Sequence, residues 1–271
     1  MPKKIILCCD FPPGDVVLLT SAVRDLHLCY PGEYVTDVRT RYPEFWENNP
    51  YISVLNEDER KAQTLACSYP LINQSNTIPF HVIHGFIEYL NESLNLNIRA
   101  TAFNGDIHLS KEEMSWFSQI HELVGEDFPF WIIVAGGKFD VTIKWWDIRR
   151  YQEVVDYFRG KIQFVQVGAD EHYHPALQGV IDLRGKTNLR ELVRLVYHAQ
   201  GVVCPVTLLM HLAAAVPVKG EIPKNRPCVV IAGGREPSQW EAYPHQQFIH
   251  TNDEACCGGD HALRCVGHES E

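Results

Sequence analysis

The sequence predicts an α/β protein with two Rossmann-like domains that face a central cleft. Short runs rich in Ile and Val recur, and each is followed by a turn signal and a stretch of helical period, as in βα units around a parallel sheet. The pattern restarts after the breaker-rich segment 125–129. We therefore expect one domain at 1–125, a second at 126–255 and a Cys- and Gly-rich tail at 256–271.

Three strands and three helices are expected in the first domain. The apolar runs predict strands at 4–10, 34–39 and 52–55. The helical spacing of apolar residues predicts helices at 16–26 and 81–95. Ser110, with Glu113 three residues later, makes a capping box that opens a further helix running to about Val124.

The second domain repeats this alternation. Strands are expected within 130–137, 161–168, 201–206 and 228–234. Helices are expected at 145–158, 188–199 and 207–216, and Asn188 with Glu191 is spaced to cap the second of them. Because loops and helix N-termini converge at the carboxyl ends of parallel strands, a ligand is expected to bind in the cleft at these ends.

Composition and charge exclude several classes of protein. The chain has 271 residues with 45% hydrophobic side chains, and its 34 acidic against 24 basic residues give a net charge of −10. No basic stripe interleaved with aromatic residues is present, so nucleic acid and anionic membrane surfaces are not expected partners. The apolar runs are shorter than the ~20 residues that span a bilayer, so no transmembrane segment is expected.

The N-terminus and the cysteines favour a cytoplasmic protein. Only five apolar residues precede Asp10, whereas a secretory signal needs about 7–15 and a cleavage site. The nine cysteines are odd in number and mostly lie in apolar runs, so reduced thiols are expected. The tail pattern Cys256-Cys257-x7-Cys265 is not a zinc-finger spacing, and we expect no metal there.

Asp15 is the first candidate for chemistry. It follows Pro12, Pro13 and Gly14 at the start of a helix, where a carboxylate is either a favourable charge at the helix N-terminus or a general base held in the cleft. The two prolines and the glycine stiffen the turn enough to aim the carboxylate. Pro13 and Gly14 are expected to line the cleft on the acceptor side.

Further candidates lie in the second domain. Lys144 lies between apolar and aromatic neighbours, where a lysine either extends its ammonium into water or binds a diphosphate beside a helix N-terminus. Thr207 begins a helix, so its hydroxyl is expected to cap that helix or to contact a phosphate oxygen. His211, on an apolar helix, is either a core residue or a catalyst. The phosphate loop G-x-x-x-x-G-K-[ST] is absent, so nucleotide hydrolysis of that class has no support.

Two segments together resemble glycosyltransferase family nine, the ADP-heptose heptosyltransferases of lipopolysaccharide assembly and their relatives that modify autotransporter proteins. The first segment, 12–40 followed by 49–55, has the family's Gly-Asp, helix, proline and two strands. The second, 182–216, leads from a strand to a helix containing Met-His-Leu-Ala. The resemblance covers most of the chain.

The resemblance implies a GT-B fold and an inverting, metal-independent glycosyl transfer that needs no cofactor. Asp15 would be the catalytic base, Lys144 would bind the donor diphosphate, and the donor site would be lined by Thr207, Met210 and His211. The donor would be a nucleotide sugar, ADP-heptose by preference, and the acceptor a hydroxyl of the lipopolysaccharide core or of a protein. Many members have an acid, then Ser or Thr, then Gly before the Met-His pair, whereas this chain has Val206-Thr207-Leu208.

Two alternatives stay open at this point. Val206 in place of the acid also fits a catalytically inactive binding or interaction module with the same fold. The same fold also serves a sugar-nucleotide epimerase or hydrolase that uses no acceptor. Adhesin-modifying relatives carry a cysteine-bound iron near this end, but the match of the tail cysteines is partial and no metal is predicted.

Overall fold

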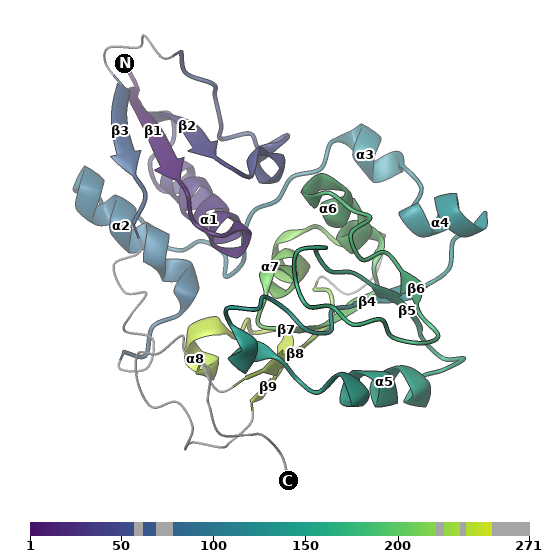
Figure 1. Ribbon diagram of the computed structural model, residues 1–271. Coiled ribbons are helices and arrows are strands. Elements are labelled where there is room, and N and C mark those ends of the chain that lie inside the picture. The colour runs from purple at the N-terminus through teal and green to yellow at the C-terminus, as the bar shows by residue number, and fades with distance from the viewer. Residues whose placement is uncertain (57–61, 69–77, 221–224, 234–236, 251–271) are drawn as a thin grey trace.

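The computed structural model describes residues 1–56, 62–68, 78–220, 225–233 and 237–250. Helices and strands alternate around two parallel sheets, one in each half of the chain (Figure 1). The α/β class is thus confirmed. The tail at 256–271 lies outside the described residues, and so do Cys256, Cys257 and Cys265.

The first sheet has three parallel strands in the order β2-β1-β3, with bounds β1 Lys3–Cys9, β2 Tyr34–Thr40 and β3 Ala62–Ala66. Ile5, Leu7 and Cys9 lie on one face of β1 and are buried in the core, as the two-residue period of a strand requires. Helix α1, Pro13–Cys29, follows β1 and begins with Pro13, which suits the first helical position because its missing N–H needs no partner there.

The strand expected at 52–55 is wrong. Ile52 makes one isolated bridge to Thr36 on β2. The chain then leaves the sheet, because the Asp37 carboxylate accepts a hydrogen bond from the Leu55 amide at 3.3 Å. The third strand is β3 at Ala62–Ala66, on the other side of β1.

The segment between the sheets holds short helices, with bounds η1 Pro43–Trp46, η3 Val82–His84, α2 Gly85–Leu94, α3 Lys111–Ser115 and α4 Gln119–Val124. The Ser110–Glu113 capping box is confirmed, but the single helix expected to run to Val124 is wrong. Trp116 is extended, and Ser118 caps a new helix by accepting a hydrogen bond from the His121 amide at 3.0 Å.

The second sheet has six parallel strands in the order β6-β5-β4-β7-β8-β9. Its strands are β4 Phe130–Ile133, β5 Gln163–Gln166, β6 Ile181–Asp182, β7 Gly201–Pro205, β8 Cys228–Ala232 and β9 Gln246–His250. Its helices are η4 Thr142–Lys144, α5 Ile148–Tyr157, α6 Leu189–His198, α7 Leu208–Ala215 and α8 Ser238–Glu241. The sequence did not predict β6, β9 or α8.

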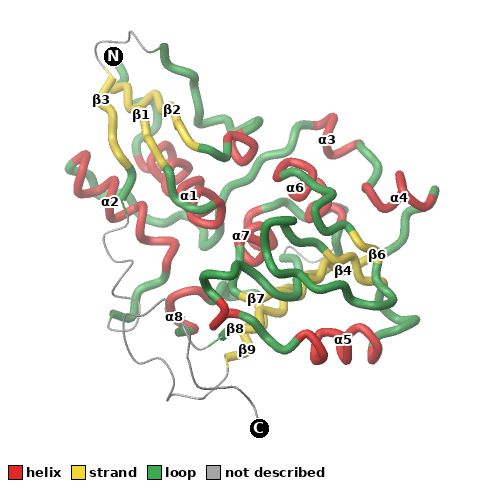
Figure 2. Tube along the Cα trace, in the orientation of Figure 1, coloured by secondary structure: helices red, strands yellow, loops and turns green. Residues whose placement is uncertain are grey.

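The strand order of this sheet is that of a doubly wound Rossmann fold. Helix α5 covers one face and α6 and α7 cover the other (Figure 2). The expected capping box of α6 is confirmed, since Asn188 and Glu191 each accept a hydrogen bond from the other's amide at 2.8 Å. No helix in the described part of the chain has the length and apolarity that a bilayer-spanning helix needs.

The half-buried Arg190 joins the two halves, and the buried Arg226 closes the end of a helix. Arg190 on α6 pairs with Glu113 at 2.6 Å and donates to the carbonyl oxygens of Glu44 and His108, which belong to the first half of the chain. Arg226 is 3% exposed and donates to four carbonyl oxygens, those of Ala199, Ala213, Val216 and Pro217. These include carbonyls at the end of α7 that have no partner within the helix.

We predict that Arg226→Met lowers the free energy of unfolding by about 2–4 kcal/mol, because buried carbonyls lose their donor. Urea unfolding followed by circular dichroism measures this change. The exposed Arg149, paired with Asp147 on the surface, is the control, and Arg149→Met should stay within about 0.5 kcal/mol of wild type. Equal effects of the two substitutions would contradict the stabilising role of the Arg226 hydrogen bonds.

Candidate active site

The strand order of the six-stranded sheet marks where a ligand should bind. Chain connections run to opposite sides from β4 and β7, and in such sheets ligands bind outside the carboxyl ends of the two strands where the direction switches. The loop after β4 leads to Lys144, and the loop after β7 leads to Thr207. Both residues that the sequence singled out for a donor diphosphate therefore lie at this point.

Lys144 and Thr207 are brought together at the start of α7. The Lys144 ammonium donates to the carbonyl oxygen of Val206 at 3.4 Å. Thr207 is the N-cap of α7, and its hydroxyl accepts a hydrogen bond from the Leu209 amide at 3.3 Å. A helix N-terminus with a lysine beside it combines backbone N–H donors with a point charge, which is an arrangement suited to phosphate oxygens.

Gly14 explains how the two halves meet at this place. A Cβ atom on Gly14 would lie 3.2 Å from Cδ2 of His211 and 3.8 Å from the Cα of Leu208. The start of α1 therefore packs directly on the start of α7. The expected cleft-lining residues Pro13 and Gly14 form the first turn of α1, and the Gly14 backbone contacts the second half of the chain.

Asp15 is half-buried in the first turn of α1. Burial raises the pKa of its carboxyl to about 6, and the positive charges of Lys144 and Lys138 act in the opposite direction. The carboxylate from the first half and the two lysines from the second are thus in electrostatic range of each other. At neutral pH this carboxyl is ionised, yet it binds a proton more readily than an exposed aspartate.

His211 is buried and uncharged. Its Nδ1 and the Tyr243 hydroxyl form a hydrogen bond of 2.8 Å. Burial lowers the pKa of His211 to about 3, and the charge of Lys144 acts in the same direction. The ring of His81 lies 5.3 Å from the ring of Tyr243, so this cluster joins α7, the turn after α8 and the segment before α2. The burial of His211 fits a packing residue, and a role of His211 at the donor site stays a prediction.

Met210, which the resemblance places at the donor site, is buried on α7. Its side chain is fully buried in the apolar core. Its carbonyl oxygen accepts a hydrogen bond from Gln246 at 2.7 Å. The burial fits a packing role, and a part of Met210 in donor binding stays a prediction.

Two features near Lys144 escaped the sequence analysis. Lys138 follows the glycine turn after β4, and its charge acts on Asp15. Trp145 stacks on Tyr173 with ring centroids 4.4 Å apart, and Phe139 lies within about 6 Å of both rings. A lysine directly after a strand-ending Gly-Gly was a usable signal for Lys138. No sequence signal predicted the ring cluster, because Tyr173 lies in the loop after a different strand.

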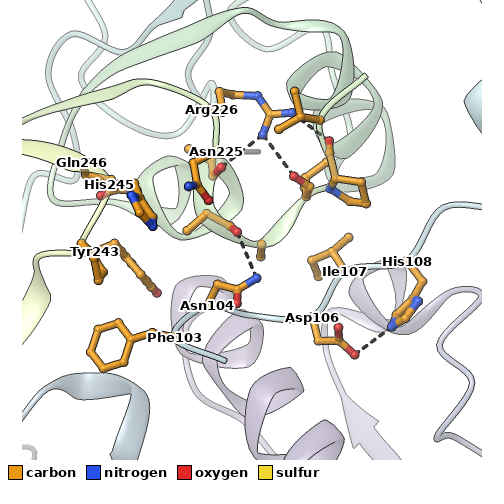
Figure 3. Close-up of a pocket in the computed structure, with 17 residues that line it drawn as sticks. Phe103, Asn104, Asp106, Ile107, His108, Asn225, Arg226, Tyr243, His245 and Gln246 are labelled. Atoms are coloured by element: carbon orange, nitrogen blue, oxygen red, sulfur yellow. Dashed lines mark hydrogen bonds and ion pairs between the residues drawn. The ribbon is translucent and has the colours of Figure 1, made fainter. Parts of the chain in front are cut away.

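A cavity of about 400 Å³ lies elsewhere, beside the far end of α7 (Figure 3). Figure 3 shows Asn104, which bonds to the carbonyl of Ala214, and the Asp106–His108 pair at 2.8 Å on one side, with Arg226 on the other. None of the sequence-predicted site residues lines this cavity. It is linked to them through Tyr243, the partner of His211, and Gln246, which donates to the Met210 carbonyl.

The described residues contain no cluster of three or more His, Cys, Asp or Glu side chains suited to a metal ion. The expectation of a metal-free, cofactor-free site stays a prediction. The tail cysteines that prompted the question lie outside the described residues.

The family profile of "Glycosyltransferase family 9 (heptosyltransferase)" matches residues 68–263. No curated protein sequence matches the chain. Several solved structures are similar to the chain. A family 9 glycosyltransferase from Veillonella parvula DSM 2008 has a TM-score of 0.68 at 16% identity, over 92% of this chain and 86% of that one.

Two Escherichia coli enzymes are also similar. ADP-heptose lipopolysaccharide heptosyltransferase II has a TM-score of 0.62 at 16% identity, over 91% of this chain and 90% of its own. The iron-containing dodecameric glycosyltransferase TibC of the enterotoxigenic strain H10407 has a TM-score of 0.62 at 17% identity, over 92% of this chain and 63% of its own. The GT-B arrangement of two Rossmann-like parallel sheets is confirmed by this likeness.

We predict that Asp15→Asn makes the protein more stable above pH 6. The pKa of Asp15 in the folded state, about 6, exceeds the unfolded value of about 3.9. As pH rises, the carboxyl therefore loses its proton at a higher pH in the folded state than in the unfolded state. The carboxyl therefore contributes stability below about pH 4 that is lost as pH rises through 6. At pH 7.5 the variant should unfold with a free energy about 1–3 kcal/mol higher than wild type, and at pH 4 with nearly the same value.

Chemical unfolding at the two pH values tests this. Asp10→Asn is the matched control, because Asp10 lies in the same turn but is exposed and only 3.7 Å from Arg41 at the surface. It should change stability by less than about 0.5 kcal/mol at either pH. An Asp15→Asn variant less stable than wild type at pH 7.5 would mean that the carboxylate supports the fold.

Proposed function

This chain belongs to glycosyltransferase family 9, the heptosyltransferase family, and we propose that it transfers a heptose from ADP-heptose to an acceptor hydroxyl with inversion at the anomeric carbon. The observation that carries the proposal is the meeting of Asp15, Lys144 and the start of α7 at the carboxyl ends of both sheets. A base and an anion site from separate halves are what a transfer between two bound substrates needs.

Asp15 is the proposed general base. Its carboxylate takes the proton of the acceptor hydroxyl as the oxygen attacks the anomeric carbon. The raised pKa, about 6, brings this group closer to the working range of a base at neutral pH than an exposed aspartate. Pro12 and Pro13 fix the backbone ahead of it, which aims the side chain.

Lys144, Thr207 and the amides at the start of α7 are the proposed diphosphate site. Negative charge grows on the departing nucleoside diphosphate as its bond to the sugar breaks. The Lys144 ammonium is held at the Val206 carbonyl, and the positive end of α7 lies next to it. Both therefore stabilise the leaving group without a metal ion.

ADP-heptose is proposed as donor because the family is the heptosyltransferases and one similar enzyme is named for ADP-heptose. The acceptor is proposed to be a hydroxyl of the lipopolysaccharide core or of a protein. The net charge of −10 disfavours nucleic acid as a further partner. A cytoplasmic location also stays a proposal.

A second candidate, binding without transfer, is favoured by Val206. It stands where many family members carry an acid, and its side chain is 3% exposed, so it offers no polar contact to a donor. Titration calorimetry with ADP, UDP and GDP sugars, followed by product analysis, tests the two candidates. Binding with sugar transfer supports the proposal, and binding without turnover supports the module.

The same product analysis distinguishes the hydrolase and epimerase alternatives. Free sugar with free nucleotide would indicate a hydrolase, and a changed sugar nucleotide would indicate an epimerase. If none of the three nucleotide sugars binds at millimolar concentration, the proposed function is wrong.

We predict that Asp15→Asn lowers turnover by roughly 10²–10⁴ while donor affinity stays near that of wild type. Asparagine keeps the shape of the side chain, and Asp15 makes no side-chain cap hydrogen bond that the change would remove, but asparagine accepts no proton. Calorimetry and a transfer assay on the same preparation separate binding from turnover. A variant that keeps more than about a tenth of wild-type turnover would place the base elsewhere.

We predict that Lys144→Ala weakens donor binding by roughly tenfold or more, because its charge contacts the diphosphate before and during the reaction. Donor affinity from calorimetry is the measurement. Lys161→Ala is the control, since Lys161 is exposed and lies over the Tyr157 ring away from this site. Unchanged affinity in Lys144→Ala would remove this lysine from the donor site.

A further inference from the structure

We propose that Cys9 and Cys67 form an oxidation site, a thiol pair that closes to a disulfide beneath the turn carrying Asp15. The disulfide would tie the end of β1 to the chain that leaves β3. The site itself rests on the geometry of the first sheet, and its effect on catalysis rests on the proposed function.

The register of the first sheet places the two thiols side by side. Cys8 pairs with Ala66 in the parallel ladder, and the Cys67 amide donates to the Cys8 carbonyl at 2.8 Å. The next residues along the two strands are Cys9 and Cys67, whose side chains share one face because paired residues of a parallel ladder point the same way. Adjacent strands lie about 4.8 Å apart, which is within the Cα separation of about 4.4–6.8 Å found across disulfides.

The two thiols also affect each other's ionisation. A hydrogen bond between the thiols lowers the pKa of Cys9 and raises that of Cys67, which makes Cys9 the one more easily ionised. Cys9 is buried, whereas Cys67 is half-buried at the edge of the same core. A small oxidant therefore reaches the pair from the side of Cys67.

The other described cysteines do not share this arrangement. Cys8 points to the opposite face of β1, because successive side chains of a strand alternate. Cys204 and Cys228 also share a thiol hydrogen bond. However, Cys204 pairs with Val230 while Cys228 pairs with Val202, so these two residues are two positions out of register, and both are buried. Cys29 is on α1, where its thiol faces the Arg99 carbonyl.

The chemistry balances with a peroxide as oxidant. The Cys9 thiolate attacks one peroxide oxygen, the O–O bond breaks, and hydroxide leaves and takes up a proton. The Cys67 sulfur then attacks the resulting sulfenic acid, the S–O bond breaks, and water leaves with the Cys67 proton. Two thiols and hydrogen peroxide thus become one disulfide and two waters, and a thiol reductant reverses the change.

The position of the pair connects it to the proposed base. Cys9 is the last residue of β1, and the Asp15 carboxylate is close enough to act on its ionisation. Closing the disulfide draws the Cys9 side chain toward β3, and the short, proline-stiffened turn from 10 to 14 carries that shift to Asp15. A displacement of about 1 Å at a catalytic group costs up to roughly hundredfold in rate.

The test treats the full-length native protein with hydrogen peroxide, blocks remaining thiols by alkylation, and maps tryptic peptides by mass spectrometry. We expect peptide 5–24 linked to peptide 62–99, two hydrogens lighter than the sum of the two. Both Cys8 and Cys9 are in the first peptide, so the variants assign the bond. Cys8→Ser should keep the link, and Cys9→Ser and Cys67→Ser should each lose it.

Transfer assays on the same samples test the effect on catalysis. Turnover of wild type should fall roughly tenfold to hundredfold on oxidation and return with dithiothreitol. Cys67→Ser, at a half-buried position, should keep its turnover after the same treatment. Because the peptide map needs no activity, a protein inactive even when reduced would count against the proposed function alone.

Three outcomes would overturn the inference. The first is the absence of the linked peptides after peroxide, including the case in which Cys9 or Cys67 is oxidised only to a sulfinic acid. The second is a link that persists in Cys9→Ser, which would assign it to Cys8. The third is a complete link with unchanged turnover, which would remove the coupling to Asp15.

Discussion

The contact between the start of α1 and the start of α7 is the constraint on which the candidate site depends. Gly14 has no side chain, and the His211 ring lies only 3.2 Å from where a Cβ would be. This approach brings the Asp15 turn of one sheet to the Thr207 cap and the Lys144 ammonium of the other. Electrostatic attraction falls with distance. A bulkier residue at position 14 would therefore weaken the attraction between the Asp15 carboxylate and the two lysine ammonium groups.

Features encoded by local sequence were predictable. Both capping boxes follow from residues three apart, and the parallel strands follow from runs of Ile and Val. The placement of Lys144 and Thr207 together required only that strand ends meet at one edge of a sheet. The wrong predictions of the strand at 52–55 and of one continuous helix to Val124 have long-range or competing causes. Asp37 captures the Leu55 amide and ends the expected strand, and Ser118 starts a new helix where one continuous helix was expected.

The rest of the site depends on contacts that no spacing in the sequence encodes. Tyr243 reaches His211 across 32 positions of the chain, and His81 lies against Tyr243 from the first half. Met210 shows the converse limit. Its place beside His211 in a family motif predicts a ligand contact, whereas the sequence around it does not reveal that its side chain is fully buried in the core.

The apolar core itself runs without interruption from the first sheet into the second. Leu7 of β1, Val17 of α1, Leu209 of α7 and Ile132 of β4 belong to one cluster of buried side chains. The two halves therefore share this cluster, and separating them would expose apolar surface to water. Proteolytic fragments produced by a cut between the two sheets would be poorly folded on their own. The intact protein should unfold in a single cooperative transition although it has two sheets.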